Sequence, residues 1–294
     1  MAQRVLILGS TGMLGHILHN TLQNSKIYEI FDISKNIQRN KNTIICDVTN
    51  FENLSKIIIR LKPSIVVNCV GILIRGSKES PLNAIIVNSA LPNFLLNLGQ
   101  KNQFKLIHIS TDCVFSGQNG PYDEFSPKDA YDIYGQSKSL GEVNSSSTLT
   151  IRTSIIGPEL KEHGEGLLHW FLTVREEQIQ GYSNVFWSGV TTLECAKAID
   201  FAIRENITGI WNLTNGIPIS KFEILSIFNE TSKLMQKKVI LNDNIKFSNK
   251  TLISRRSDIV YHVPNYLEMF DHLFQYINQN KEDYKHYFSS QTKF

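Results

Sequence analysis

The chain has 294 residues, of which 41% are hydrophobic and 19% are charged, as in an ordinary globular protein. Its net charge is +3 without long runs of like charge, so neither nucleic acid nor a membrane surface is indicated as a partner. Its four cysteines lack disulfide-framework or zinc spacing, so no metal site is predicted. We find no cleavable leader and no apolar run of the about 18 residues that span a bilayer, and expect a cytoplasmic protein.

The chain begins with an apolar strand followed by a glycine-rich turn. Residues 4–8 form a continuous apolar run, typical of a strand covered on both faces. Gly9, Gly12 and Gly15 follow, and apolar residues then recur at helical spacing. Such glycines permit a tight turn, let a pyrophosphate approach the backbone, and let the helix pack closely. The turn therefore predicts a dinucleotide site, and the alternative is a plain tight turn.

An acidic residue follows the second predicted strand, at residues 27–31. Asp32 at the end of that strand would accept hydrogen bonds from a ribose and repel a 2′-phosphate. This favours NAD over NADP. Ser34 and Lys35 are close enough in the sequence to accommodate a phosphate instead, so both cofactors stay open.

Strands and helices continue to alternate through residue 152. The further predicted strands are residues 43–46, 64–71, 104–109 and 148–152. The predicted helices between them are residues 51–61, 82–98 with Gly99 at its end, and 134–145, with a polar loop at 75–81. This alternation predicts an α/β fold with a Rossmann-type, doubly wound parallel sheet.

Beyond Gly157 the pattern loosens. We expect helices at 166–177, 193–204, 220–234 and 267–277, extended segments at 184–187 and 209–213, and a frayed polar end over the last dozen residues. The predicted domains are a dinucleotide-binding domain at residues 1–155, with returning segments at about 184–213, and a smaller C-terminal α/β substrate lobe at 156–294.

Polar residues that could take part in catalysis lie in two places. Ser110 and Thr111 follow the fifth strand, and open α/β sheets bind ligands outside the carboxyl ends of their strands. Tyr134 and Lys138 are four residues apart and therefore share one face of a predicted helix. A nearby ammonium favours the phenolate and lowers the pKa of a tyrosine. An amphipathic helix can carry Tyr-x-x-x-Lys by chance, so the pair indicates a catalytic site only together with the other motifs.

The glycine turn, the Ser-Thr pair and Tyr-x-x-x-Lys together resemble the extended short-chain dehydrogenase/reductases that act on nucleotide sugars. The strings at 110–117 and 134–142 are most similar to the dTDP-4-dehydrorhamnose reductase branch, and the resemblance covers residues 1–215. It implies NAD(H) or NADP(H) as cofactor, a nucleotide-sugar substrate and a homodimer. The implied reaction reduces a 4-keto-6-deoxy nucleotide sugar for surface polysaccharide synthesis.

The resemblance also implies roles for individual residues. Tyr134 would protonate the sugar carbonyl oxygen, Lys138 would lower the tyrosine pKa and hold the nicotinamide ribose, and Thr111 would hydrogen-bond the carbonyl. Asn88 would support a water near the lysine, or else bond to the backbone as an ordinary helix amide. The implied cofactor contacts are Gly9, Thr11, Gly12, Met13, Leu14, Gly15, Asp32, Asp47, Val48, Cys69, Val70 and Gly71, together with Tyr134 and Lys138.

The residue after Thr111-Asp112 bears on the reaction. At the place of residues 111–113, the similar sugar 4,6-dehydratases carry Thr-Asp-Glu, with the glutamate as a base. Cys113 replaces that glutamate in this sequence, which disfavours dehydration. A cysteine at this place also resembles epimerase-reductases in which it pairs with a histidine, here His163 or His169. A thiolate base needs a lowered pKa. The favoured alternative is that Cys113 packs under the sheet, and a third hypothesis is a cofactor-binding protein without turnover.

Substrate contacts complete the predicted site. Asp112 and Cys113 are candidates because they follow Thr111 directly. Trp187 would wall a nucleobase, and Arg255 would clamp the nucleotide pyrophosphate. The alternatives are that the tryptophan belongs to the core and that the arginine is solvated.

Overall fold

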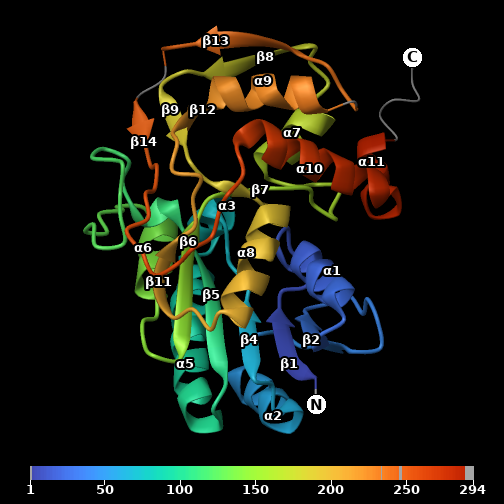
Figure 1. The fold of residues 1–294 in the computed structure, drawn as a ribbon, viewed down its shortest axis with the longest axis vertical. Coiled ribbons are helices and arrows are strands. Elements are labelled where there is room, and N and C mark those ends of the chain that lie inside the picture. Colours follow the sequence, from blue (N-terminus) through green and yellow to red (C-terminus); the bar gives the residue numbers. More distant parts are fainter. Residues whose placement is uncertain (1, 233, 245–246, 289–294) are drawn as a thin grey trace.

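The computed structural model describes residues 2–232, 234–244 and 247–288. Within these residues, seven strands form a parallel sheet: β1 (Gln3–Leu8), β2 (Tyr28–Ser34), β3 (Thr43–Ile45), β4 (Ile65–Asn68), β5 (Lys105–Thr111), β6 (Thr148–Thr153) and β11 (Gly209–Asn212). Their spatial order is β11-β6-β5-β4-β1-β2-β3 (Figure 1). The chain thus builds the sheet outward from β1 in one direction through β3 and then in the other from β4. This confirms the predicted Rossmann-type parallel sheet.

Helices cover both faces of the sheet (Figure 1). On one face lie α1 (Gly15–Ser25) and α8 (Thr192–Arg204), which pack against each other. The other face carries α2 (Phe51–Leu61), α4 (Pro81–Ala84), the π-helical segment η1 (Ile85–Ala90), α5 (Leu91–Asn102) and α6 (Ile133–Leu140). The residues of β4 and of the apolar part of β1 are fully buried between these layers, which explains their continuous apolar sequences.

The helical run at residues 81–102 differs from its prediction. It passes through Gly99 and ends at Asn102, where Gln103 adopts the left-handed conformation, and Phe104 packs closely against Gly99. The run is apolar enough over 18 residues to span a bilayer by composition, but 50% of that window is buried inside the fold. Its buried residues Leu91, Leu95 and Leu98 belong to the core on this face of the sheet, which accounts for that composition.

A second lobe faces the carboxyl ends of the strands (Figure 1). Its helices are α7 (Leu167–Thr173), α9 (Lys221–Thr231) and α10 (Tyr266–Gln279), and its strands are β8 (Gln178–Tyr182), β9 (Val185–Trp187), β12 (Ile219–Ser220), β13 (Lys238–Asn242) and β14 (Ser248–Asn249). The short strands β7 (Ile155–Ile156) and β10 (Val190–Thr191) pair with each other. Strand β11 and helix α8, from the predicted returning segment, join the first domain, while the exact division into domains stays a prediction.

The end of the chain is more ordered than we expected. Residues 281–288 form η3 (Lys281–Tyr284) and α11 (Lys285–Phe288), and residues 289–294 lie outside the described part. The tyrosines Tyr284 and Tyr287 are 0% and 1% exposed. The Tyr284 hydroxyl lies 2.7 Å from Nε2 of His16 in α1, and the Tyr287 hydroxyl accepts a hydrogen bond from Glu159 N at 3.0 Å. Buried aromatic rings therefore hold a segment whose overall polarity indicated fraying.

Candidate active site

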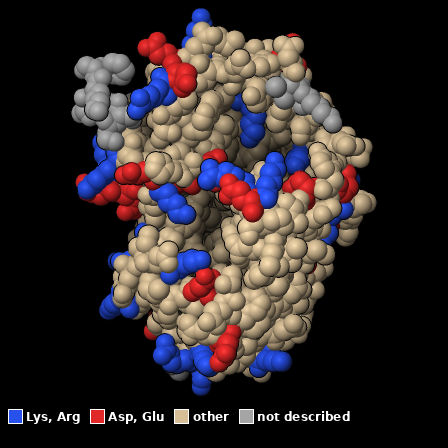
Figure 2. Space-filling view, turned by 180° about the vertical axis from the view of Figure 1, so that it is seen from behind, with Lys and Arg blue, Asp and Glu red and all other residues tan. Residues whose placement is uncertain are grey.

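A cavity of about 670 Å³ lies at the carboxyl ends of β1, β4 and β5. The glycine turn, the helix α3 (Ile74–Glu79), the end of β5, α6 and residues 153–166 line it. Figure 2 shows a hollow across the middle of the molecule with charged side chains along it. This is the edge of the sheet at which open α/β folds bind ligands.

Most of the predicted site residues meet at this cavity. The cofactor candidates that line it are Thr11, Gly12, Met13, Leu14, Cys69, Val70 and Gly71. The predicted catalytic residues Thr111, Tyr134 and Lys138 line the same cavity, as do Asp112 and Cys113. Residues distant along the chain thus converge, while their individual roles stay predictions.

The glycine turn has the shape that a dinucleotide pyrophosphate needs. Gly9 has φ +82°, and a Cβ on Gly15 would collide with the carbonyl oxygen of Gly9, so both positions require glycine. Gly12 is exposed, and the cavity lies over it. Helix α1 begins without a side-chain cap, which leaves first-turn N–H groups available to an anion. These residues fit a bound nicotinamide dinucleotide.

Two further glycines position α6, and sequence reasoning missed them. A Cβ on Gly135 would collide with the carbonyl oxygen of Cys113, in the 3₁₀ turn η2 (Asp112–Val114). A Cβ on Gly141 would collide with the carbonyl oxygen of Asn88 in η1. The helix therefore lies directly against both segments. This close packing brings its tyrosine and lysine to the cavity.

Tyr134 keeps its proton at neutral pH. Burial raises the pKa of its phenol above the usual range, the Cys113 thiol raises it further, and a side-chain hydrogen bond with Thr111 partly opposes them. The amine of Lys138 instead donates to the carbonyl oxygen of Ile109 at 2.6 Å. Burial and Cys113 dominate the Tyr134 pKa in this structure, and the expectation that Lys138 lowers that pKa stays a prediction. A protonated phenol is nevertheless the form that a general acid requires.

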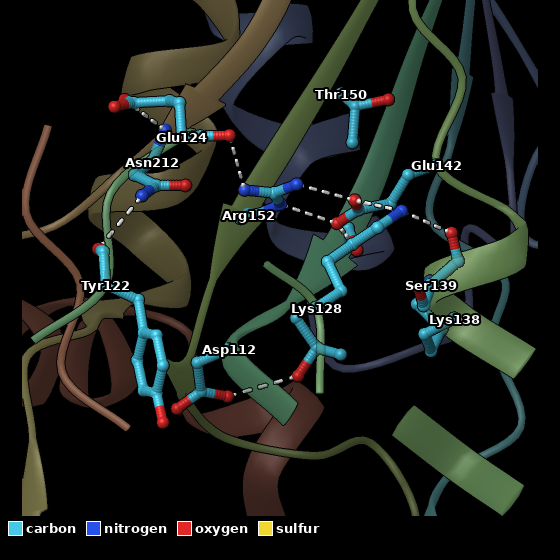
Figure 3. A network of polar contacts seen from close by, with 12 residues as sticks. Asp112, Tyr122, Glu124, Lys128, Lys138, Ser139, Glu142, Thr150, Arg152 and Asn212 are labelled. Carbon is cyan, nitrogen blue, oxygen red and sulfur yellow. Dashed lines mark hydrogen bonds and ion pairs between the residues drawn. The ribbon is translucent and has the colours of Figure 1, made fainter. Parts of the chain in front are cut away.

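Lys138 lies near a buried ionic network centred on Glu142 (Figure 3). Burial lowers the pKa of its amine from the usual 10.5 to about 8, and the Glu142 carboxylate opposes that shift. Glu142 accepts hydrogen bonds from Arg152 Nε at 2.7 Å and Nη2 at 2.8 Å. It also accepts from the Ser110 hydroxyl at 2.8 Å and pairs with Lys128 at 3.2 Å. The Ser110 hydroxyl is thereby committed to Glu142.

The Asn88 amide bonds to the backbone, as in the second of the two roles considered for it. Its Oδ1 accepts from Ile72 N at 2.8 Å. Its Nδ2 donates to Ile72 O at 3.0 Å and to the Ser137 hydroxyl at 3.1 Å. The amide therefore ties the loop after β4 to α6. Its π-helical setting is frequent near functional sites.

The environment of Cys113 does not favour a thiolate base. Burial raises the pKa of the Cys113 thiol to about 12, and the neighbouring Asp112 adds to this shift. His169 is buried, with Nε2 accepting from Gly164 N at 3.1 Å and Nδ1 lying 3.0 Å from the Tyr287 hydroxyl. Both of its ring nitrogens are thus engaged, so it is not poised as the cysteine's partner.

Five predicted cofactor contacts do not line the cavity: Gly9 and Gly15, which shape the glycine turn, and Asp32, Asp47 and Val48. Asp32 is inside β2, not at its end, and is fully buried. Its carboxylate accepts hydrogen bonds from the Ser10 hydroxyl at 2.5 Å and the Thr43 hydroxyl at 3.2 Å. The preference for NAD that rested on Asp32 therefore loses its basis. Asp47 and Val48 follow β3 and do not line the cavity.

Two predicted substrate contacts are also placed elsewhere. Trp187 is 2% exposed and packs in the core against the rings of Tyr266 and Phe270. Its reading as a wall for a nucleobase is wrong. Arg255 forms an ion pair with Asp123 at 2.8 Å and lines a separate cavity beside β11. It does not reach the main cavity to clamp a pyrophosphate.

The cavity also has walls that the sequence did not indicate. Helix α3 occupies part of the predicted polar loop, and residues 159–166 lack any periodic pattern. The charged residues that these two segments contribute are Arg75, Lys78, Glu159, Lys161 and Glu165. Glu159 accepts hydrogen bonds from Gly166 N at 2.7 Å and Glu165 N at 2.9 Å, so it orders the loop that enters α7.

Comparison with known proteins finds relatives that cover most of the chain. SpsK, a spore coat polysaccharide biosynthesis protein of Bacillus subtilis, is 25% identical over 256 residues, covering 84% of this chain and 86% of SpsK. The dTDP-4-keto-6-deoxy-D-glucose reductase of Streptomyces niveus is 26% identical over 221 residues, covering 73% and 74%. The dTDP-4-dehydrorhamnose reductase of Bacillus anthracis, crystallised with NADP, has the same fold, with a TM-score of 0.81, 23% identity, and 94% and 100% coverage. Residues 3–240 match the family model of the RmlD substrate binding domain, and the chain belongs to that family.

Proposed function

We propose that this protein uses NADH or NADPH to reduce the carbonyl of a 4-keto-6-deoxy nucleotide sugar. The observation that carries this proposal is the convergence of Thr111, Tyr134 and Lys138 on the cavity above the glycine turn. The relative from Streptomyces niveus is named as a reductase of such a dTDP-linked sugar, which supports the substrate class. The name of SpsK supports a place in polysaccharide precursor synthesis.

The side chains divide the chemistry among them. A bound nicotinamide dinucleotide would supply the hydride that reaches the carbonyl carbon. Tyr134 gives its proton to the carbonyl oxygen, and this transfer is favourable because an alkoxide is more basic than a phenolate. The Thr111 hydroxyl hydrogen-bonds that oxygen, and one such donor contributes about 3 kcal/mol to transition-state stabilisation. The Lys138 ammonium stabilises the phenolate that Tyr134 leaves behind.

Replacing Tyr134 by phenylalanine tests the proposal. Cofactor consumption would be followed with dTDP-, UDP- and GDP-linked keto sugars, and the variant should lose about 10²- to 10⁴-fold in kcat with its best substrate. Its cofactor affinity and thermal unfolding should stay near wild type, because the ring remains in place. An undiminished rate would contradict the assignment. If the wild type oxidises cofactor with none of these sugars, a binding protein without turnover is the better description.

The epimerase-reductase alternative makes a different prediction. Epimerisation exchanges protons beside the carbonyl, so a reaction in deuterated water would place deuterium at C3 or C5 of the product. We expect no deuterium at these carbons, because burial holds Cys113 as a thiol. A Cys113→Ser variant should accordingly keep its reductase rate. Deuterium at either carbon that disappears in this variant would establish the alternative.

A further inference from the structure

Two buried tyrosines connect the C-terminal segment, residues 281–288, to the walls of the active cavity. Tyr284 and Tyr287 are 0% and 1% exposed, and their rings stack with centroids 6.2 Å apart. The hydroxyl of each reaches an imidazole ring, His16 in α1 for Tyr284 and His169 in α7 for Tyr287. Neither tyrosine is among the residues that line the cavity. Each can therefore act on the cavity only through its hydrogen-bond partners.

His16 joins Tyr284 to the middle of the glycine turn. Its Nδ1 lies 2.8 Å from the carbonyl oxygen of Gly12, and its Nε2 lies 2.7 Å from the Tyr284 hydroxyl. The ring is fully buried, and burial lowers the pKa of His16 to about 4, so the ring is neutral at pH 7. Because a carbonyl oxygen only accepts, Nδ1 carries the single ring proton and Nε2 accepts from the phenol. The tyrosine hydroxyl thus fixes the histidine that holds Gly12.

Tyr287 holds a second wall, the loop at residues 159–166, at two points. Its hydroxyl accepts a hydrogen bond from Glu159 N at 3.0 Å, at the start of the loop. The same hydroxyl lies 3.0 Å from Nδ1 of His169, whose Nε2 accepts from Gly164 N at 3.1 Å. Burial lowers the pKa of His169, so its ring is also neutral, and Nδ1 donates to the tyrosine because Nε2 is the acceptor. One phenol therefore fixes both ends of the loop.

The two walls also touch each other. A Cβ on Gly166, at the end of the loop, would lie 3.5 Å from the sulfur of Met13 in the glycine turn. Both residues line the cavity. A shift of either wall therefore changes the space available to a ligand that lies on the turn.

We propose that Tyr284 and Tyr287 are positioning residues of the active site, through which the C-terminal segment holds the glycine turn and the loop at 159–166 in place for their ligands. The part of this inference that concerns the sugar rests on the proposed reductase function. Tyr284 acts on the bound dinucleotide through His16 and the glycine turn. Tyr287 acts on the loop, and through the loop on the sugar.

Phenylalanine variants test this, because they remove each hydroxyl and keep the buried ring. Tyr284→Phe should weaken binding of NADH or NADPH about 3- to 10-fold in a fluorescence titration without sugar, the effect of one buried hydrogen bond. Tyr287→Phe should speed tryptic cleavage after the exposed Lys161 by a similar factor. It should also raise KM for the sugar more than it lowers kcat.

Tyr266→Phe is the matched control. Tyr266 is also a buried tyrosine near the end of the chain, but its hydroxyl donates to the carbonyl oxygen of Ile217, which does not line the cavity. This variant should keep the wild-type dinucleotide affinity, cleavage rate and KM. Thermal unfolding of all three variants separates local effects from a general loss of stability.

Each other outcome has a defined meaning. If the Tyr284 and Tyr287 variants lose only stability, as the control does, the tyrosines merely fill the core and the proposal is overturned. Proton–nitrogen NMR correlation spectra should place the ring proton of His16 and of His169 on Nδ1, and a proton on Nε2 of His16 would overturn it too. A protein that reduces no sugar, but whose dinucleotide affinity depends on the Tyr284 hydroxyl, would refute the proposed function and leave this inference standing.

Discussion

Replacing Glu142 by glutamine should destabilise the fold and also reduce the charge of Lys138, because one carboxylate serves both. The side chains of Glu142 and Arg152 are 1% and 3% exposed. Two parallel hydrogen bonds of 2.7 and 2.8 Å join them, and Arg152 Nη1 also donates to the carbonyl oxygen of Glu124 at 3.2 Å (Figure 3). The amide would leave the guanidinium buried without its counterion.

The burial of this pair sets the expected magnitude. Removing one partner of a buried ion pair costs about 3–5 kcal/mol, whereas an exposed pair contributes about 0.2–1 kcal/mol. Lys128 is also attracted to Glu142, but its side chain is 32% exposed, so water compensates it when the carboxylate is lost. We therefore expect Glu142→Gln to lose about 3 kcal/mol or more in unfolding free energy.

The effect on Lys138 distinguishes an electrostatic role from simple loss of packing. Glu142 raises the Lys138 pKa against the effect of burial, so Glu142→Gln should move the alkaline limb of kcat/KM below pH 8. Arg152→Met is the matched control, since it keeps the carboxylate and removes a cation. It should also destabilise the protein, but without moving that limb downward.

Urea unfolding and pH–rate profiles of the two variants measure both effects. The double variant should be less destabilised than the sum of the single variants, because it leaves no unpaired buried charge. The reasoning fails if Glu142→Gln costs less than about 1 kcal/mol, the value typical of an exposed pair. It also fails if both single variants shift the alkaline limb in the same direction.

The remaining predictions concern the glycine turn and the lysine itself. Gly15→Ala should lower the unfolding free energy by about 3 kcal/mol and weaken binding of the nicotinamide dinucleotide, because its Cβ meets the Gly9 backbone; an unchanged melting temperature would contradict this, and Gly12→Ala, at an exposed position, is the control for stability alone. The Lys138 pKa is lower in the folded state, so the unfolded state binds more protons between pH 8 and 10.5. Wild-type stability should therefore rise by about 3 kcal/mol relative to Lys138→Met across that window, as followed by urea unfolding; a constant difference would contradict it.

Local sequence patterns predicted the features that depend on neighbouring residues in the chain. The apolar run of β1, the glycines after it and the periodicity of α2 identify their elements without reference to the rest of the molecule. The helix predicted from residue 220 is present as α9, and a capping box formed by Ser220 and Glu223 begins it. The Tyr134–Lys138 spacing likewise placed both side chains on one face of a helix. These successes gave the fold and the centre of the candidate site.

The errors arose where the position of a residue in space decided its role. Asp32 was placed at a strand end, but β2 continues for two residues, so the carboxylate turns inward. Trp187 belongs to a core formed with α10, a helix about 80 residues later in the chain, which no local pattern reveals. Tyr284 and Tyr287 were included in a polar tail, although burial of their rings outweighs the polarity of their neighbours.

The close packing of α6 explains why a weak motif is informative in this protein. A tyrosine and a lysine on one helix face are common, but their side chains meet a ligand only if the helix lies against the end of β5. Gly135 and Gly141 permit this, because each replaces a side chain with contact to a carbonyl group of another segment. In the string Tyr-Gly-Gln-Ser-Lys-Ser-Leu-Gly-Glu, the glycines thus set the position of the helix and the final glutamate sets the charge of its lysine. The string therefore acts as one unit, and its nine residues predict chemistry more reliably than the tyrosine–lysine pair alone.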